Sequence, residues 1–278
     1  MAKFSWEYEW RKQKLKEETF LVNHMVEKTA GWTHMVEEKV PEKLQGTLEK
    51  AFGKAFVAVF EKGGAIIEKT YNRKKKESNF QKNKDLLEQG AGKSKALKKI
   101  EWQAKCSIGK NLALSSVEGI GLGAIGIGVP DIPIFVSVLL KSIYEIAISY
   151  GYSYTEDKER LFILKLIDTA LQTGEVLQKK DNDLNVFIEQ ELKEKKREDK
   201  VTTDPFVTKL KIVRQIDYSA KALSDELLYG KFVQGVAVVG IIGGTADITC
   251  LKKITEYAIL KYKRRFLLEQ NENSLVMD

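Results

Sequence analysis

Cysteine, proline and histidine are scarce in this sequence, which has two Cys, four Pro and two His among 278 residues. Two cysteines, Cys106 and Cys250, are too few for a disulfide framework, so we expect free thiols in a reducing compartment. The histidines, His24 and His34, do not have metal-ligand spacing, and we recognise no nucleophile paired with a base. We therefore expect no catalytic residue, no metal and no cofactor; carboxylate-only chemistry is the enzymatic alternative that stays open.

Long apolar runs are also lacking. No stretch reaches the ~18 uninterrupted apolar residues of a typical membrane-spanning helix. The N-terminal sequence MAKFSWEYEWRKQ is charged and aromatic and has no apolar core of a secretory signal. We expect a protein on the cytoplasmic side of the membrane.

Charge is plentiful and unevenly distributed. The net charge is +7, and residues 69–110 alone carry 13 Lys or Arg against four Asp or Glu. Such a basic block favours a polyanionic partner, either an anionic membrane surface or nucleic acid. Nucleic-acid binding is disfavoured, because no reading module is recognisable.

Two glycine-rich apolar runs organise the chain, at residues 119–128 and 235–244. The first contains a GxGxxG pattern, but it lacks the preceding strand and the distant acid of a dinucleotide site. Its small-residue spacing, repeated from Gly240 to Gly244, instead permits close helix packing. Asp131 and Asp247 follow the two runs, and we expect both to cap helices. We predict two glycine-rich helical hairpins in a pseudo-repeat.

Apolar residues recur at three- and four-residue steps in most other segments, which predicts an all-α multi-helix bundle. Residues 3–29 form the first predicted helix, with Leu15, Val22 and Met25 on its apolar face and Trp6 and Trp10 docked on the core. Further helices are predicted from residues 41, 93, 131, 155, 204 and 254. Pro133 fits a first helical turn.

The segment from Lys93 resembles a basic amphipathic helix. Leu97, Ile100, Ala104 and Ile108 lie on one side, and the polar side carries Lys95, Lys98, Lys99 and Lys105. This pattern is typical both of a surface helix packed on a core and of a membrane-surface element. We predict lipid or partner contact at these four lysines and at Ile120, Leu122, Ile125 and Ile127 of the first glycine run.

We expect a single domain over residues 1–278. Two strongly charged stretches, residues 69–95 and 180–203, are predicted to be exposed charged insertions or linkers.

The order of these features resembles the EcsC family, named after the third product of a bacterial operon that encodes an ABC transporter. The resemblance is carried by the tryptophan-rich first helix, the glycine-rich runs and a set of single residues: Asp131, Pro133, Tyr150, Gly151, Arg160, Gly240 and Arg265. It departs from the family at the second glycine run, where no proline precedes it and Asp247 stands near a usual Asn. The resemblance implies a helical bacterial protein and gives no settled activity.

The leading hypothesis is a non-catalytic, peripheral membrane-associated accessory or scaffold protein on the inner face of the cell membrane. An anionic membrane surface is the expected partner, together with a transporter or another protein. The alternative from a different class is a membrane-inserting or pore-forming protein that uses the glycine-rich hairpins.

Overall fold

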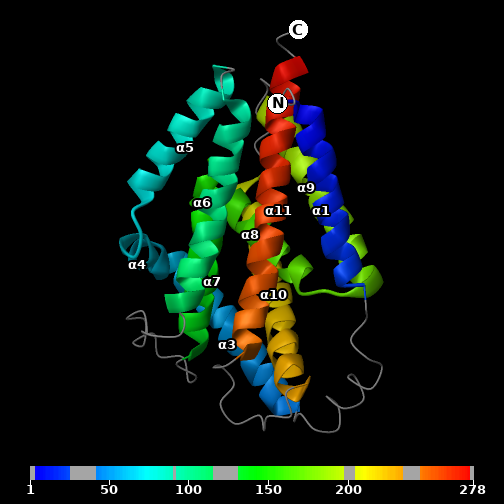
Figure 1. The fold of residues 1–278 in the computed structure, drawn as a ribbon. Coiled ribbons are helices and arrows are strands. Elements are labelled where there is room, and N and C mark those ends of the chain that lie inside the picture. The colour runs from blue at the N-terminus through cyan, green and yellow to red at the C-terminus, as the bar shows by residue number, and fades with distance from the viewer. Residues whose placement is uncertain are drawn as a thin grey trace.

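The computed structural model describes residues 4–25, 42–89, 92–114, 131–196, 204–233 and 245–275. These residues form helices and contain no strand, which confirms the all-α class (Figure 1). In chain order the elements are α1 (Trp6–Asn23), α3 (Glu42–Ala58), the π-helical turn η1 (Val59–Gly63), α4 (Gly64–Lys69), α5 (Arg73–Glu88), α6 (Lys93–Leu114), α7 (Asp131–Ser149), α8 (Asp157–Ala170), α9 (Gly174–Lys196), α10 (Pro205–Val233) and α11 (Thr245–Leu275).

Helix α7 is the apolar centre of the bundle and packs against α3, α5, α6 and α11. In the described part of the chain it alone is long and apolar enough to cross a membrane, yet 94% of the stretch Ile132–Ser149 is buried inside the protein. The two charged side chains of this stretch are buried as an ion pair, in which Lys141 Nζ lies 3.0 Å from Glu145 Oε1. Pro133 lies in the first turn, as predicted.

The first helix packs with a polar face, which corrects the sequence prediction. Leu15, Val22 and Met25 are exposed, whereas Glu9, Gln13, Glu17 and Phe20 are buried. Helix α1 lies along α11 (Figure 1), and Gln13 Nε2 donates to Leu260 O at 2.8 Å. Sequence periodicity assigned the wrong face of α1 to the core, because α11 presents cations rather than aliphatic side chains where it packs against α1.

Lys261 of α11 is the most completely enclosed of these cations. Its ammonium lies 2.7 Å from Asp181 Oδ1 and 3.1 Å from Glu17 Oε2, and it donates to Asn185 Oδ1 at 2.9 Å. An ammonium has three donors, and three oxygens surround this one. Charges without such partners are rarely buried, so Lys261 ties α1 and α9 to α11.

Lys263 fixes α6 in the same way. Its Nζ lies 2.6 Å from Glu101 Oε1 and 3.6 Å from Glu9 Oε2. Burial opposes ionisation of Glu101, but Lys263, Lys16 and Lys12 outweigh it and lower the pKa of this carboxyl. Helix α6 therefore turns one acidic side chain inward against α11.

The two charged stretches expected to be linkers or exposed insertions are helical where the structure describes them. Helix α5 starts at an Asn72 cap, whose side chain accepts from Lys75 N at 2.9 Å, and it packs on α6 and α7 through buried Leu87. Helix α9 buries Leu184, Ile188 and Leu192. The high charge density of these stretches suggested exposure to solvent, but a few apolar residues on one face are enough to dock a helix on the core. Whether these stretches are insertions stays a prediction.

The connection between α7 and α8 requires a glycine. Gly151 has φ +86°, a left-handed conformation that only glycine adopts without strain. A Cβ at this position would also overlap the ring of Phe80 from α5. Tyr150 is fully buried beside it, with its ring 6.1 Å from that of Phe266.

Replacing Gly151 with Ala should lower the free energy of unfolding by about 2–3 kcal/mol, because strain and overlap with Phe80 add. Gly46→Ala is the matched control. Gly46 lies inside α3 with open space around its Cα, so Ala should raise stability by about 0.5–1 kcal/mol. Urea denaturation of the three proteins measures both effects; equal stabilities would contradict the described backbone.

Glu101→Gln should destabilise the protein by about 3 kcal/mol at neutral pH, because Lys263 then loses its nearest carboxylate. The pKa of Glu101 is depressed by folding, so its contribution is present above the unfolded carboxyl pKa and disappears as pH falls through the folded value. Denaturation at several pH values should show the variant and the wild type converging in acid. Glu88→Gln, which removes an exposed 3.7 Å pair with Lys84, should change little.

Candidate membrane-facing surface

The inner face of α6 is the apolar stripe that the sequence predicts. Ala96, Leu97, Ile100 and Ala104 are buried against the bundle; the side chain of Ile108 lies outside the described set. The interpretation of α6 as a helix packed on the core is therefore confirmed.

The outer face of α6 combines lysines with a tryptophan. Lys95, Lys98, Lys99 and Lys105 are all exposed, and none of them forms an ion pair with a described carboxylate. Trp102, which the sequence reasoning missed as a site residue, is 66% exposed. It lies one or two helical turns from each lysine, so all five share one side of the helix. We call these five residues the α6 surface.

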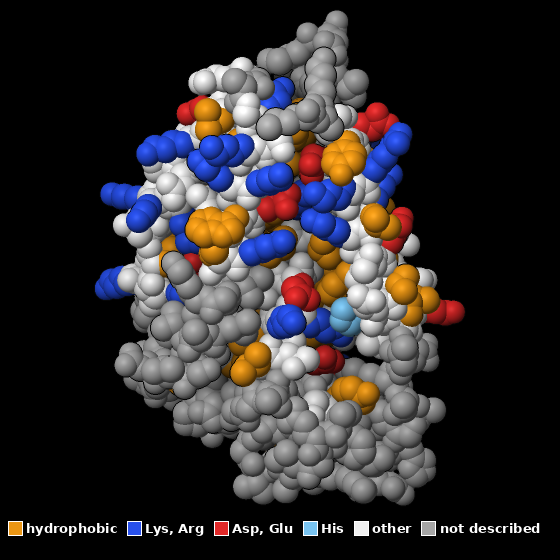
Figure 2. Space-filling model, viewed as in Figure 1, with side chains coloured by type: hydrophobic (Ala, Val, Ile, Leu, Met, Phe, Trp, Pro, Cys, Tyr) orange, Lys and Arg blue, Asp and Glu red, His pale blue; other side chains and the backbone are white. Residues whose placement is uncertain are grey.

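Helix α1 extends the positive charge beside the α6 surface. Lys16 Nζ lies 4.0 Å from Glu101 Oε2. Burial lowers the pKa of Lys16, and the nearby cations Lys263, Lys105 and Lys12 lower it further against the opposing effect of Glu101. Figure 2 shows Lys and Arg side chains gathered over the half of this face where α5, α6, α11 and α1 lie in Figure 1, with apolar side chains exposed between them.

Helix α5 divides its lysines between the surface and the interior. Lys74, Lys75 and Lys82 are exposed. Lys76 instead forms a 2.8 Å ion pair with Glu145 of α7 and donates to Ser107 Oγ of α6 at 2.7 Å. The basic block is thus partly structural, because one of its members neutralises a buried carboxylate.

The apolar half of the predicted contact set cannot be placed. Ile120, Leu122, Ile125, Ile127 and Gly240 lie outside the described residues. The glycine-rich hairpins and their pseudo-repeat therefore stay predictions. Helix α7 begins at Asp131 and α11 at Thr245, so Asp131 and Asp247 lie in first helical turns, where a carboxylate is favourable; whether they cap the helices is not shown.

Family-motif residues assemble a packing site, away from the α6 surface. Arg265 donates to both carboxylate oxygens of buried Glu159, at 2.8 and 2.9 Å, and Tyr262 Oη donates to the same carboxylate at 2.6 Å. The Arg265 guanidinium lies between the rings of Tyr152 and Phe162, 4.1 and 4.3 Å from their centroids. Together with Tyr150 and Gly151, Arg265 joins the α7–α8 connection to α11.

Arg160 and Pro133 do not join this group. The Arg160 guanidinium pairs with Asp157 at 3.1 Å and lies 5.8 Å from the ring centroid of Phe60. Sequence reasoning did not single out Glu159 as a site residue, although it lies in the first turn of α8 and is the natural partner for a motif arginine.

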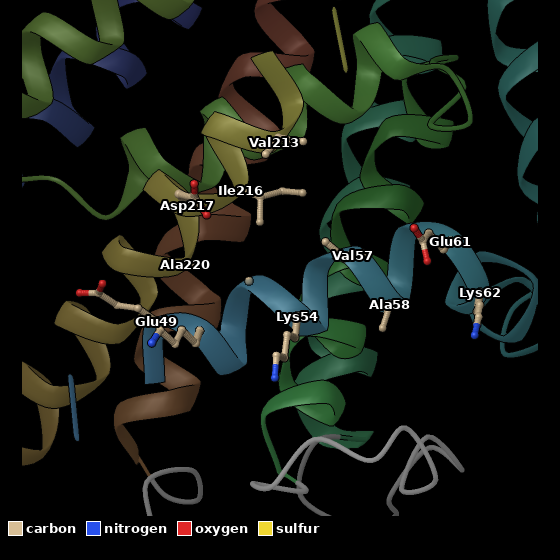
Figure 3. Close-up of a pocket in the computed structure, with 12 residues that line it drawn as sticks. Glu49, Lys54, Val57, Ala58, Glu61, Lys62, Val213, Ile216, Asp217 and Ala220 are labelled. Atoms are coloured by element: carbon tan, nitrogen blue, oxygen red, sulfur yellow. The ribbon is translucent and has the colours of Figure 1, made fainter. Parts of the chain in front are cut away.

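An open groove of about 690 Å³ lies between α3 and α10 (Figure 3). Val57, Ile216 and Ala220 give it an apolar floor. The charged side chains at its edge, including Glu49, Lys54, Glu61 and Lys62, point in different directions (Figure 3), so they do not converge on a ligand atom. Among the described residues, no three His, Cys, Asp or Glu side chains are grouped to hold a metal ion.

Comparison with known proteins gives a family and no established activity. The chain matches the EcsC protein family over residues 7–267. It is 30% identical over 167 residues to the uncharacterized protein YdbA of Bacillus subtilis (strain 168), covering 59% of this chain and 57% of YdbA. It is 24% identical over 142 residues to Protein EcsC of the same strain, covering 50% of this chain and 52% of that protein.

The chain thus spans little more than half the length of the curated relatives it matches. No solved structure matches it. The match to the family covers nearly the whole chain and includes both the α6 surface and the Arg265 packing site. This chain therefore belongs to the EcsC protein family.

Proposed function

We propose that this protein binds the surface of anionic membranes through the α6 surface and acts there as a non-catalytic accessory or scaffold protein. The observation that carries the proposal is Trp102, a large aromatic side chain left 66% exposed among four exposed lysines. Tryptophan is enriched where a protein meets the membrane interface, because its ring is apolar and its N–H is polar. The lysines supply attraction to acidic headgroups.

The free energy expected from four lysines favours binding to anionic over neutral lipid. Each Lys near an anionic bilayer contributes about 1 kcal/mol, so four contribute about 4 kcal/mol. That corresponds to roughly a thousandfold preference for anionic over neutral lipid. Salt weakens the attraction, because the Debye length is only about 8 Å at physiological ionic strength.

The α6 surface is held rigidly, which favours binding as a preformed platform. Glu101, next to Trp102 in sequence, is anchored to Lys263 at 2.6 Å. Lys76 of α5 donates to Ser107, further along the same helix. Little backbone order has to be gained on binding, so less of the interaction energy is lost.

The accessory role at a membrane protein such as an ABC transporter rests on the family resemblance alone. The cytoplasmic side of the membrane is likewise proposed, because the acidic lipids that attract polybasic segments lie in that leaflet.

Exchange of Lys95, Lys98, Lys99 and Lys105 for Gln should reduce binding to vesicles with anionic lipid by two to three orders of magnitude, by roughly 1 kcal/mol per lysine. The matched control exchanges four exposed lysines elsewhere, Lys50, Lys179, Lys193 and Lys209, and changes the net charge equally. Vesicle flotation of both variants, with neutral vesicles alongside, measures the effect. The proposal would be contradicted if the wild type bound neutral and anionic vesicles equally or bound neither. Equal losses of binding in the two variants would show that the α6 surface is not the binding site.

Trp102→Phe should strongly reduce the membrane-dependent blue shift of tryptophan fluorescence, because Trp102 is the tryptophan of the α6 surface, whereas Trp6 and Trp10 pack against the core. Trp102→Ala should also weaken vesicle binding, and neither change should alter the fold, since the side chain is largely in solvent. A blue shift that persists in Trp102→Phe would place the contact elsewhere. Leakage of a dye from loaded vesicles on protein addition would favour the pore-forming alternative over surface binding.

A further inference from the structure

A second pocket, of about 310 Å³, lies among α8, α9 and α10. Its charged walls are two ammonium groups, Lys165 and Lys180, and two carboxylates, Asp168 and Asp183, with Gln215 and Tyr218 beside them. It belongs to different helices from the α6 surface, and nothing in the proposed function uses it. Its volume is at the lower end of the range for small-molecule sites.

Asp168 is already neutralised within this pocket. Lys180 Nζ lies 2.6 and 2.7 Å from its two carboxylate oxygens. Gln215 and Gln172 each donate a further hydrogen bond, at 3.1 and 3.0 Å. Asp168 therefore has no need of an added cation, while Lys180 keeps one of its three N–H donors.

Lys165 is different, because its ammonium forms no ion pair with a carboxylate in the described part of the chain. Its Nζ lies 5.7 Å from the ring centroid of Phe187. Burial lowers the pKa of Lys165 and outweighs the attraction of Asp183 and Asp168, while Lys211 and Lys180 lower it further. A half-buried ammonium that has lost solvent and lies at ion-pair distance from no described carboxylate is a place where a bound oxyanion is favourable.

We propose that this pocket binds the oxyanion group of a small soluble molecule, a phosphate monoester or a carboxylate, between Lys165 and Lys180. The two ammonium groups donate to the anion, and charge-assisted hydrogen bonds of this kind are the strong ones. The Tyr218 ring, whose centroid is 5.9 Å from Lys180 Nζ, offers an aromatic wall for the rest of the ligand.

The test uses the full chain labelled with 13C-lysine and follows the Lys165 Cε signal by NMR. Inorganic phosphate and acetate are added separately at constant ionic strength, with chloride as the balancing anion. We expect saturable shifts of this signal and an upward shift of its titration, because an anion stabilises the charged ammonium.

Lys165→Gln identifies the signal and should weaken phosphate binding, followed through backbone amides of α8 and α10, about tenfold or more. Lys209→Gln, an exposed change on α10, should leave binding unchanged. Lys180→Gln is unsuitable, because it would leave the buried Asp168 carboxylate without its cation. Circular dichroism checks that each variant is folded.

Three results would overturn the proposal: no saturable shift with either anion, equal phosphate affinity in Lys165→Gln and wild type, or a response only to vesicles that carry phosphate-monoester headgroups. The last result would assign the pocket to lipid rather than to a soluble molecule. None of these outcomes depends on whether the α6 surface binds membranes.

Discussion

Burial of cations on α11 is the constraint on which the rest of this bundle depends. Lys261, Lys263 and Arg265 each need a carboxylate, and these come from α1 and α9, from α6, and from α8. Removing one partner of a buried pair typically costs about 3–5 kcal/mol. Four helices, α1, α6, α8 and α9, are therefore placed around α11 by charge, while the apolar α7 packs against α6 and α11.

The outer face of α6 follows from its inner face. Because Leu97, Ile100 and Ala104 have to face the bundle, the helical period sends Lys98, Trp102 and Lys105 to the opposite side. Glu101 lies at the edge between the two faces, where it reaches Lys263. The rotation of α6 about its axis is thus fixed by one ion pair as well as by Leu97 and Ile100. A surface that gathers lysines without carboxylate partners results from the same contacts that stabilise the fold.

Sequence periodicity predicted the helices with strong apolar stripes, namely α6, α7 and α8. The family resemblance singled out Gly151, Tyr150 and Arg265. Periodicity did not predict the buried face of a helix where that face is polar. The buried face of α1 carries Glu9, Gln13 and Glu17, which read as solvent-exposed until their partner helix is known. Trp102 could have been found, because it lies seven residues after Lys95 on the same face. The pocket at Lys165 could not, because it requires three helices to be brought together.

The enclosure of α7 has a consequence for synthesis on the ribosome. Glu17 and Lys261 are 244 residues apart in the chain, and at about 5–20 residues per second the lysine is made roughly 10 to 50 seconds after its partner. For somewhat less than half of that interval the complete apolar segment Ile132–Ser149 has been made without the helix α11 that will cover it. The nascent protein thus exposes a stretch as hydrophobic as a membrane-spanning helix. Chaperones, or fast docking on α5 and α6, have to cover it until translation ends.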